Sequence, residues 1–202
     1  KALLKPFGTQ SKFVLLGFLL VTAIFSMFLS NTATAAMMLT FLTPVLKALP
    51  ADGKGKIALA MAIPVAANIG GIGTPIGTPP NAIALKYLND PAGLGFNIGF
   101  GDWAMVMMPF TILLLILAWL LLIKLFPFKD KEIHLNIEGN TVKGPRLVIA
   151  YITLGLTIVL WLLDKVTGIN ANTVAMIPIA IFCVTGLFGK EDLKEINWDV
   201  LW

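Results

Sequence analysis

Charged residues divide the sequence into long uncharged stretches, and this alternation is the clearest structural pattern in the chain. Uncharged stretches of 17 to 34 residues cover 13–46, 57–85, 103–123, 147–163 and 166–189. A helix that crosses a bilayer needs about 20 consecutive apolar residues. The pattern therefore predicts an all-α polytopic membrane protein.

The first stretch, residues 13–46, is too long for one crossing and too short for two. Its centre is polar, because Ser30, Asn31 and Thr32 follow one another and Ser26 lies one turn earlier. Two short helices that meet at this polar centre would form a re-entrant hairpin, which enters and leaves the membrane on the same side.

The positions of the lysines favour this hairpin, since Lys and Arg gather in short loops on the inner side of a membrane. The other crossings are expected at about 57–85, 103–123, 147–163 and 169–188. With the hairpin, 13 of the 15 basic residues lie inside, against 10 if residues 13–46 crossed the membrane. The net charge of +4 is thus explained by topology, and no nucleic-acid partner is expected.

A second break is predicted in residues 68–81, which contain four glycines and three prolines. Proline and glycine disfavour a helix interior by about 3 and 1 kcal/mol. We expect a half-helix near 57–70, a loop near 71–78 and a second half-helix near 79–88. Thr78 would be the N-cap of the second half-helix.

Each break places the carbonyls that end one helix beside the N–H groups that begin the next. Neutral Ser, Thr and Asn oxygens suit Na⁺, and their hydroxyl and amide donors suit a carboxylate. Small polar residues also occur where ordinary membrane helices pack together. Two breaks in successive stretches nevertheless favour a transport site, because discontinuous helices form the binding sites of secondary transporters.

The predicted crossings contain no Asp, Glu, His, Lys or Arg. Proton-coupled carriers use such intramembrane groups, so sodium coupling or anion exchange is favoured, and an enzyme is not expected. Residues 99–102 match the GxGD pattern of intramembrane aspartyl proteases, but Asp102 is interpreted as the N-cap of a helix starting at Trp103. A membrane-embedded enzyme and a purely structural membrane subunit are the alternatives from other classes.

Two segments resemble a known family when they are taken in order. Residues 30–36 read SNTATAA and residues 73–81 read GTPIGTPPN. Together they are similar to the divalent anion:sodium symporter family, which carries di- and tricarboxylates and sulfate. The resemblance is weaker over 103–202, where hydropathy dominates.

The resemblance implies a homodimer that works by an elevator motion and is built from two inverted repeats. Each repeat has a re-entrant hairpin and a broken helix, so this chain would hold half of an inverted-repeat transporter fold. Because residue 1 is Lys, we expect a longer protein whose N-terminal helices and second hairpin lie outside this sequence. The expected parts are a transport-domain part over 1–123 (hairpin 13–46, broken helix 57–88, helix 103–123), a cytoplasmic linker with an amphipathic helix over 124–146, and incomplete scaffold helices over 147–202.

The resemblance also implies roles for individual residues. Sodium would be held by Ser26, Ser30, Asn31 and the backbone of Gly73. The substrate would be contacted by Asn31, Thr32, Thr74 and Pro75. Thr78 and Asn81 would support the loop.

The expected function is sodium-coupled symport of dicarboxylates of the succinate, malate and fumarate class across the plasma (inner) membrane. The alternatives are a sodium-independent carboxylate exchanger and a carrier of sulfate or another oxyanion.

Overall fold

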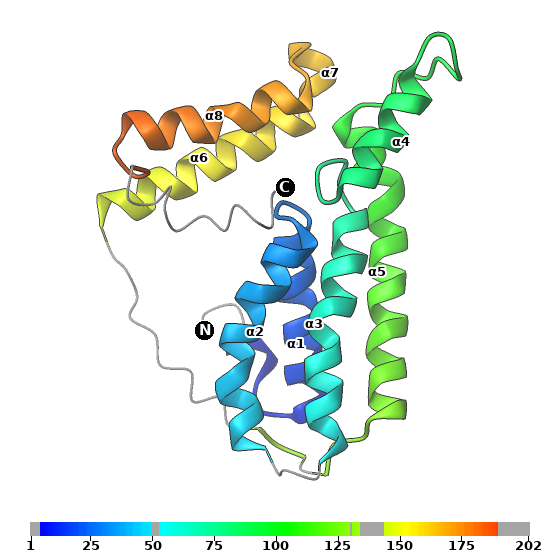
Figure 1. Cartoon of the computed structure of the whole chain (residues 1–202), viewed down its shortest axis with the longest axis vertical. Coiled ribbons are helices and arrows are strands. Elements are labelled where there is room, and N and C mark those ends of the chain that lie inside the picture. The colour runs from blue at the N-terminus through cyan, green and yellow to red at the C-terminus, as the bar shows by residue number, and fades with distance from the viewer. Residues whose placement is uncertain (1–4, 50–52, 130, 134–143, 190–202) are drawn as a thin grey trace. The chain divides into compact units, whose positions relative to one another are not determined.

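The computed structural model describes residues 5–49, 53–129, 131–133 and 144–189 (Figure 1). These residues form α-helices, a short 3-10 helix and no strand, which confirms the all-α prediction. The helices are η1 (Lys5–Phe7), α1 (Ser11–Ser26), α2 (Asn31–Ala48), α3 (Lys54–Ile72), α4 (Pro79–Asn89), α5 (Phe100–Leu125), α6 (Pro145–Leu162), α7 (Asp164–Thr167) and α8 (Ala171–Val184).

The chain divides into two compact units. One comprises residues 1–98 and 103–139, and the other comprises residues 99–102 and 140–202. Each is described by itself below.

In the first unit, α1 and α2 form a helical hairpin that packs along α3 (Figure 1). The predicted pair of short helices is confirmed, with a turn over residues 27–30 between them. The core is contributed mainly by α1 and α3, where Phe18, Leu19, Leu59 and Ile63 have no exposed surface. The position of this hairpin in a membrane stays a prediction.

The predicted break after α3 is also confirmed, since the helix stops at Ile72 and α4 starts at Pro79. Thr78 occupies the predicted N-cap position, but its side chain makes no capping hydrogen bond. The reason is local: the second helical residue, Pro80, has no N–H, and the N–H of Asn81 donates to the backbone carbonyl of Thr78.

Helices α3, α5 and α6 are the described helices that are long and apolar enough to cross a membrane. Helix α5 exposes much of its apolar surface: Met105 and Val106 are 77% and 68% exposed. Such a face is suited to contact with lipid. Helix α8, at 14 residues, is shorter than the crossing predicted over 169–188. Gly168 and Gly186, which bracket it, adopt positive φ angles of 68° and 66°.

The second unit corrects the interpretation of Asp102. Helix α5 begins at Phe100, so Asp102 lies inside its first turn and is not the N-cap of a helix starting at Trp103. Its Oδ2 accepts from the Gly99 N–H at 2.7 Å, while Asp164 Oδ2 accepts from the Phe100 N–H at 2.6 Å. Two carboxylates therefore accept hydrogen bonds from N–H groups at the start of α5, and the helix begins three residues earlier than predicted. Lys165 pairs with Asp102 at 2.5 Å.

The linker predicted over 124–146 is helical at its start, where α5 continues to Leu125, and again from Pro145. Residues 126–129 and 131–133 are not helical. Residues 130 and 134–143 of the linker lie outside the described residues, so the amphipathic helix expected in this linker stays a prediction.

Candidate functional site

The turn of the hairpin is closed by its own backbone and by Ser30. The N–H groups of Met27 and Leu29 donate to carbonyls near the end of α1, at Ala23 and Phe25. Ser30 is the N-cap of α2, and its hydroxyl oxygen accepts from the Ala33 N–H at 3.3 Å. The carbonyl end of α1 thus lies next to the N–H end of α2, as the polar centre of the stretch predicts.

The loop between α3 and α4 is held by one amide side chain. Asn81 is buried, and its Nδ2 donates to the backbone carbonyls of Gly71 and Thr74, each at 2.8 Å. The Gly73 N–H donates to the Gly70 carbonyl at 3.0 Å, which tightens the end of α3. The Thr74 carbonyl also accepts from the Gly77 N–H at 3.3 Å. These bonds give the carbonyls of the loop partners, which buried backbone carbonyls need.

The two breaks, which are separated by about 40 residues in sequence, meet in space. The buried Ser26 hydroxyl lies 2.7 Å from the Ala67 carbonyl of α3. In the loop that follows α3, the buried Thr74 hydroxyl donates to the Met27 carbonyl at 2.5 Å. One hydrogen bond therefore ties the hairpin to α3, and another ties its turn to the loop that follows.

Two glycines of α3 make this close approach possible. A Cβ on Gly70 would overlap the Ala23 backbone, and a Cβ on Gly71 would lie 2.5 Å from Asn31 Oδ1. Real Cβ atoms essentially never approach other atoms so closely. Only glycine at these positions lets the helices and the Asn31 amide come together.

A group of neutral oxygens gathers where the breaks meet; we call it the oxygen cluster. It consists of Ser26 Oγ, Asn31 Oδ1 and the Ala67 carbonyl, with Asn68 Oδ1 beside it. Ser26 Oγ lies 2.8 Å from Asn31 Oδ1, and Asn31 Nδ2 donates to Asn68 Oδ1 at 3.0 Å. A serine hydroxyl has a single proton, so Ser26 cannot fully satisfy both of its neighbouring acceptors. The cluster offers more oxygen lone pairs than protons, which is the composition that a hard cation uses.

A groove of about 420 Å³ opens between α2 and α3 next to the oxygen cluster. Asn31, Thr32 and Asn68 supply its polar lining, while Ala35, Ala36 and Ala67 keep it wide. The first turn of α2 lies at this groove, and a helix N-terminus favours an anion. The arrangement can therefore place a cation and an anion side by side without any charged side chain.

The structure brings together some of the predicted site residues and separates others. Asn31 belongs to both the oxygen cluster and the groove, Ser26 belongs to the cluster, and Thr32 lines the groove. Ser30 is exposed at the turn. Thr74 and Pro75 are buried in the loop and do not line this groove, and Gly73 packs against Met27.

Sequence reasoning missed Ala67, Asn68 and Gly71 as parts of this site. Ala67 contributes a backbone oxygen, which no side-chain pattern reveals. Asn68 could have been predicted from the sequence, because an amide side chain in an otherwise apolar helix needs a hydrogen-bond partner. Within the described residues no group of three or more His, Cys, Asp or Glu side chains could hold a metal ion.

The sequence is similar to a family of transporters and to several of its named members. The model of the family described as citrate transporter (CitMHS) matches residues 1–202. The sequence is 36% identical over 226 residues to the sodium-dependent dicarboxylate transporter SdcS of Staphylococcus saprophyticus, covering 98% of this chain and 43% of the relative.

Two eukaryotic relatives differ in the substrate that their names give. The sodium-dependent high-affinity dicarboxylate transporter 3 of Caenorhabditis elegans is 33% identical over 170 residues, covering 74% of this chain and 30% of the relative. The low-affinity phosphate transporter PHO90 of Saccharomyces cerevisiae is 31% identical over 200 residues, covering 96% of this chain and 22% of the relative. The chain thus spans less than half the length of these curated relatives.

Proposed function

Because the chain belongs to the citrate transporter family, as its resemblance to the divalent anion:sodium symporters predicted, we propose that the whole protein is a sodium-coupled dicarboxylate symporter. The family and the named relatives are transporters rather than enzymes, in agreement with the prediction from the sequence. The observation that carries the proposal is the oxygen cluster beside the groove at the meeting of the two breaks.

In this proposal sodium binds first, at Ser26, Asn31 and the Ala67 carbonyl. Na⁺ is a hard cation that accepts lone pairs from neutral oxygens, so it would bind among these three oxygens while the Ser26 hydroxyl keeps its proton and donates it elsewhere. Ser30 and the Gly73 backbone, which the family resemblance adds to the sodium ligands, lie on the two segments that meet there. The ion would fix the turn of the hairpin against α3.

The anion then binds in the groove through Asn31, Thr32 and the first turn of α2. A carboxylate needs N–H and O–H donors to replace the water that it loses. The amide of Asn68 adds a further donor or acceptor on the α3 side. Thr74 and Pro75 act in this proposal by shaping the loop, since the Thr74 hydroxyl already donates to Met27.

Coupling follows from the shared residue. Asn31 touches both sites, so an ion that orders Asn31 also prepares the anion site, and each ligand strengthens the binding of the other. A tenfold sodium gradient supplies about 1.4 kcal/mol per ion, and each net positive charge moved inward gains about 2.3 kcal/mol per 100 mV. A dianion is therefore driven inward best by more than two sodium ions.

The elevator motion and the homodimer are also part of the proposal. The first unit alone contains both breaks, the oxygen cluster and the groove. It could therefore move as one body without losing its ligands. We expect the protein to work in the plasma membrane, as a multi-pass protein with both ligands crossing together.

Uptake of radiolabelled succinate into proteoliposomes that contain the full-length protein tests this function. We expect uptake with an inward Na⁺ gradient and none with K⁺. Ser26→Ala should raise the sodium concentration needed for half-maximal uptake. Thr43→Ala is the matched control, because Thr43 does not line the groove and its hydroxyl donates to a backbone carbonyl within α2. Sodium-independent uptake that needs internal carboxylate would replace symport with exchange.

Phosphate is the second candidate substrate, because a relative is named as a phosphate transporter. Neutral donors at a helix N-terminus recognise phosphate as well as carboxylate. Competition distinguishes the two: unlabelled succinate should suppress labelled succinate uptake at concentrations where inorganic phosphate does not. The reverse order of competition would assign phosphate.

A further inference from the structure

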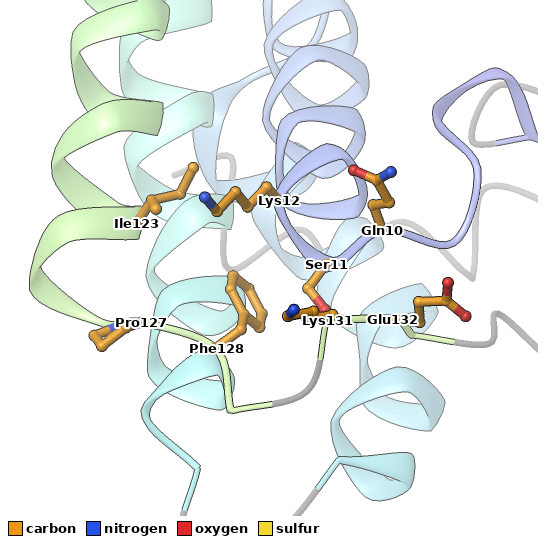
Figure 2. A pocket seen from close by; sticks show the side chains of 8 residues that line it. All are labelled: Gln10, Ser11, Lys12, Ile123, Pro127, Phe128, Lys131 and Glu132. Carbon is orange, nitrogen blue, oxygen red and sulfur yellow. The ribbon is translucent and has the colours of Figure 1, made fainter.

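A second cavity lies at the other end of the first unit, beside the start of α1. It encloses about 580 Å³, and its walls include Lys12, Lys131, Ile123, Pro127 and Phe128 (Figure 2). None of these residues belongs to the oxygen cluster or the groove. We call this cavity the basal pocket.

Backbone hydrogen bonds fix the walls of the basal pocket. The Ser11 N–H donates to the Lys131 carbonyl at 2.9 Å, and the Ile133 N–H donates to the Thr9 carbonyl at 2.6 Å. These bonds accompany an antiparallel bridge between Gln10 and Glu132. The segment that follows α5 is therefore clamped against the start of α1.

One aromatic ring lines the pocket and two others lie beside it. The Trp119 indole N–H donates to the Lys12 carbonyl at 2.9 Å, and its ring stacks on Phe13 with centroids 6.4 Å apart. Phe128 lies directly against Gly55, at the start of α3. Tryptophan is enriched where a membrane meets water, so its place beside the pocket is typical of the headgroup level.

The charges of the pocket are arranged asymmetrically. In Figure 2 the ammonium ends of Lys12 and Lys131 point toward the side formed by Ile123, Pro127 and Phe128, whereas the Glu132 carboxylate points away from it. The apolar side of the pocket thus receives two positive charges. A ligand that fits this pattern carries a negative charge next to an apolar part.

Helix α5 extends this apolar side along the molecule. On the face of α5 that carries the pocket residue Ile123, the residues Ile112, Ile116 and Leu120 precede it at helical spacing and are 54%, 46% and 51% exposed. A free inorganic anion would make no use of such a surface, but acyl chains would lie along it. Basic pockets at the membrane surface next to apolar helices bind anionic lipid headgroups.

We propose that the basal pocket binds the phosphate headgroup of an anionic phospholipid, with the acyl chains along α5. Lys12 and Lys131 contact the phosphate, and Ile123, Pro127 and Phe128 contact the glycerol and the first methylenes. The inference goes beyond transport, because it does not depend on which substrate the protein carries.

Native mass spectrometry of the purified full-length protein, titrated with phosphatidylglycerol in a neutral detergent, tests the proposal. One lysine near an anionic lipid surface contributes about a fivefold change in binding. Combining Lys12→Gln with Lys131→Gln should therefore weaken the tightest lipid site roughly 25-fold. The matched control combines Lys47→Gln with Lys124→Gln, which removes the same charge from exposed positions that do not line the pocket.

Four results would overturn the proposal. The first two concern the affinity for phosphatidylglycerol: an equal loss of affinity in the control and the test variant, or no loss in the test variant. The other two are equally tight binding of phosphatidylcholine and displacement of the lipid by millimolar inorganic phosphate. The last would assign the pocket to a soluble anion. A single Lys131→Glu variant, whose side chain is exposed, keeps the test available if the double variant is poorly expressed, and it too should lose the tight site.

Discussion

The two ends of the first unit place different kinds of polar group where segments of the chain meet. At the oxygen cluster, α1, α2 and α3 meet through a hydroxyl, an amide and a backbone carbonyl. At the basal pocket, backbone hydrogen bonds join the start of α1 to the segment after α5, and the side chains that line the cavity beside them include two lysines and a glutamate. Charged side chains are costly inside a bilayer and inexpensive at its surface. The difference indicates that the oxygen cluster is built for membrane depth and the basal pocket for the water boundary.

The two ends also differ in how tightly they are packed. Gly70 approaches the backbone of Ala23, which cannot move without moving α1. Gly55 approaches the ring of Phe128, a side chain that can rotate. Packing is therefore rigid where ligands are proposed to bind and adjustable where the lipid is proposed to bind.

The largest expected effect is the loss of transport in Asn31→Ala. The substitution removes the amide that bonds to both Ser26 and Asn68, so it damages the sodium and anion sites together. We expect initial uptake in proteoliposomes to fall at least about 100-fold, the loss seen when a key polar contact worth about 3 kcal/mol is removed.

The same Asn31→Ala preparation should have the oligomeric size of the wild type by light scattering, which we propose is that of a dimer. Thr43→Ala, on the same helix, should transport normally. Wild-type uptake and sodium dependence in Asn31→Ala would show that the oxygen cluster is not the site.

The second prediction concerns the side of the membrane on which the hairpin ends. Lys12 and Lys54 stand at the starts of α1 and α3. In a background with Cys183→Ser, single Lys12→Cys and Lys54→Cys variants should both react with a membrane-impermeant maleimide from the inner face only. Labelling from opposite faces would mean that residues 13–46 cross the membrane, and the oxygen cluster could not then lie at the end of a re-entrant hairpin.

The third prediction tests the rigid end of the packing. Gly70→Ala places a methyl group against the Ala23 backbone, and overpacking of this kind costs about 1–3 kcal/mol. We expect a lower unfolding temperature in detergent together with reduced uptake. Gly155→Ala in α6 is the control, since nothing lies within 4 Å of its added Cβ. That variant should gain up to about 1 kcal/mol from helix propensity. Equal stability of the two variants would contradict the close approach of α1 and α3.

The positions of both breaks could be predicted from sequence because their causes are local. Glycine, proline and a polar triplet disfavour a helix wherever they stand, and Ser30 caps α2 with an atom three residues from its partner. The limits of α5 could not be predicted in this way. Its first turn depends on Asp164, whose carboxylate accepts a hydrogen bond from the Phe100 N–H, 64 residues earlier in the sequence.

The candidate site shows the same division. Ser26, Asn31 and Thr32 could be proposed from the sequence because their side chains are polar in an apolar stretch, and their roles stay predictions. Ala67 was not, because its contribution is a carbonyl that every residue has. Thr74 was predicted to contact substrate, but the structure directs its hydroxyl to Met27. Only the fold shows which hydroxyl is already used.

The smallest expected effect belongs to Gly55→Ala, and it separates the two kinds of packing most directly. The added methyl group would overlap the Phe128 ring, but Phe128 lies beyond the end of α5 and its ring can turn away. The cost of moving the ring is offset by the better helix propensity of alanine, about 1 kcal/mol. The unfolding temperature should therefore change far less than in Gly70→Ala, and uptake should stay at the wild-type rate. Because Phe128 lines the basal pocket, the displaced ring should still alter the affinity for phosphatidylglycerol. A loss of stability as large as that of Gly70→Ala would mean that the basal end is as rigid as the oxygen cluster.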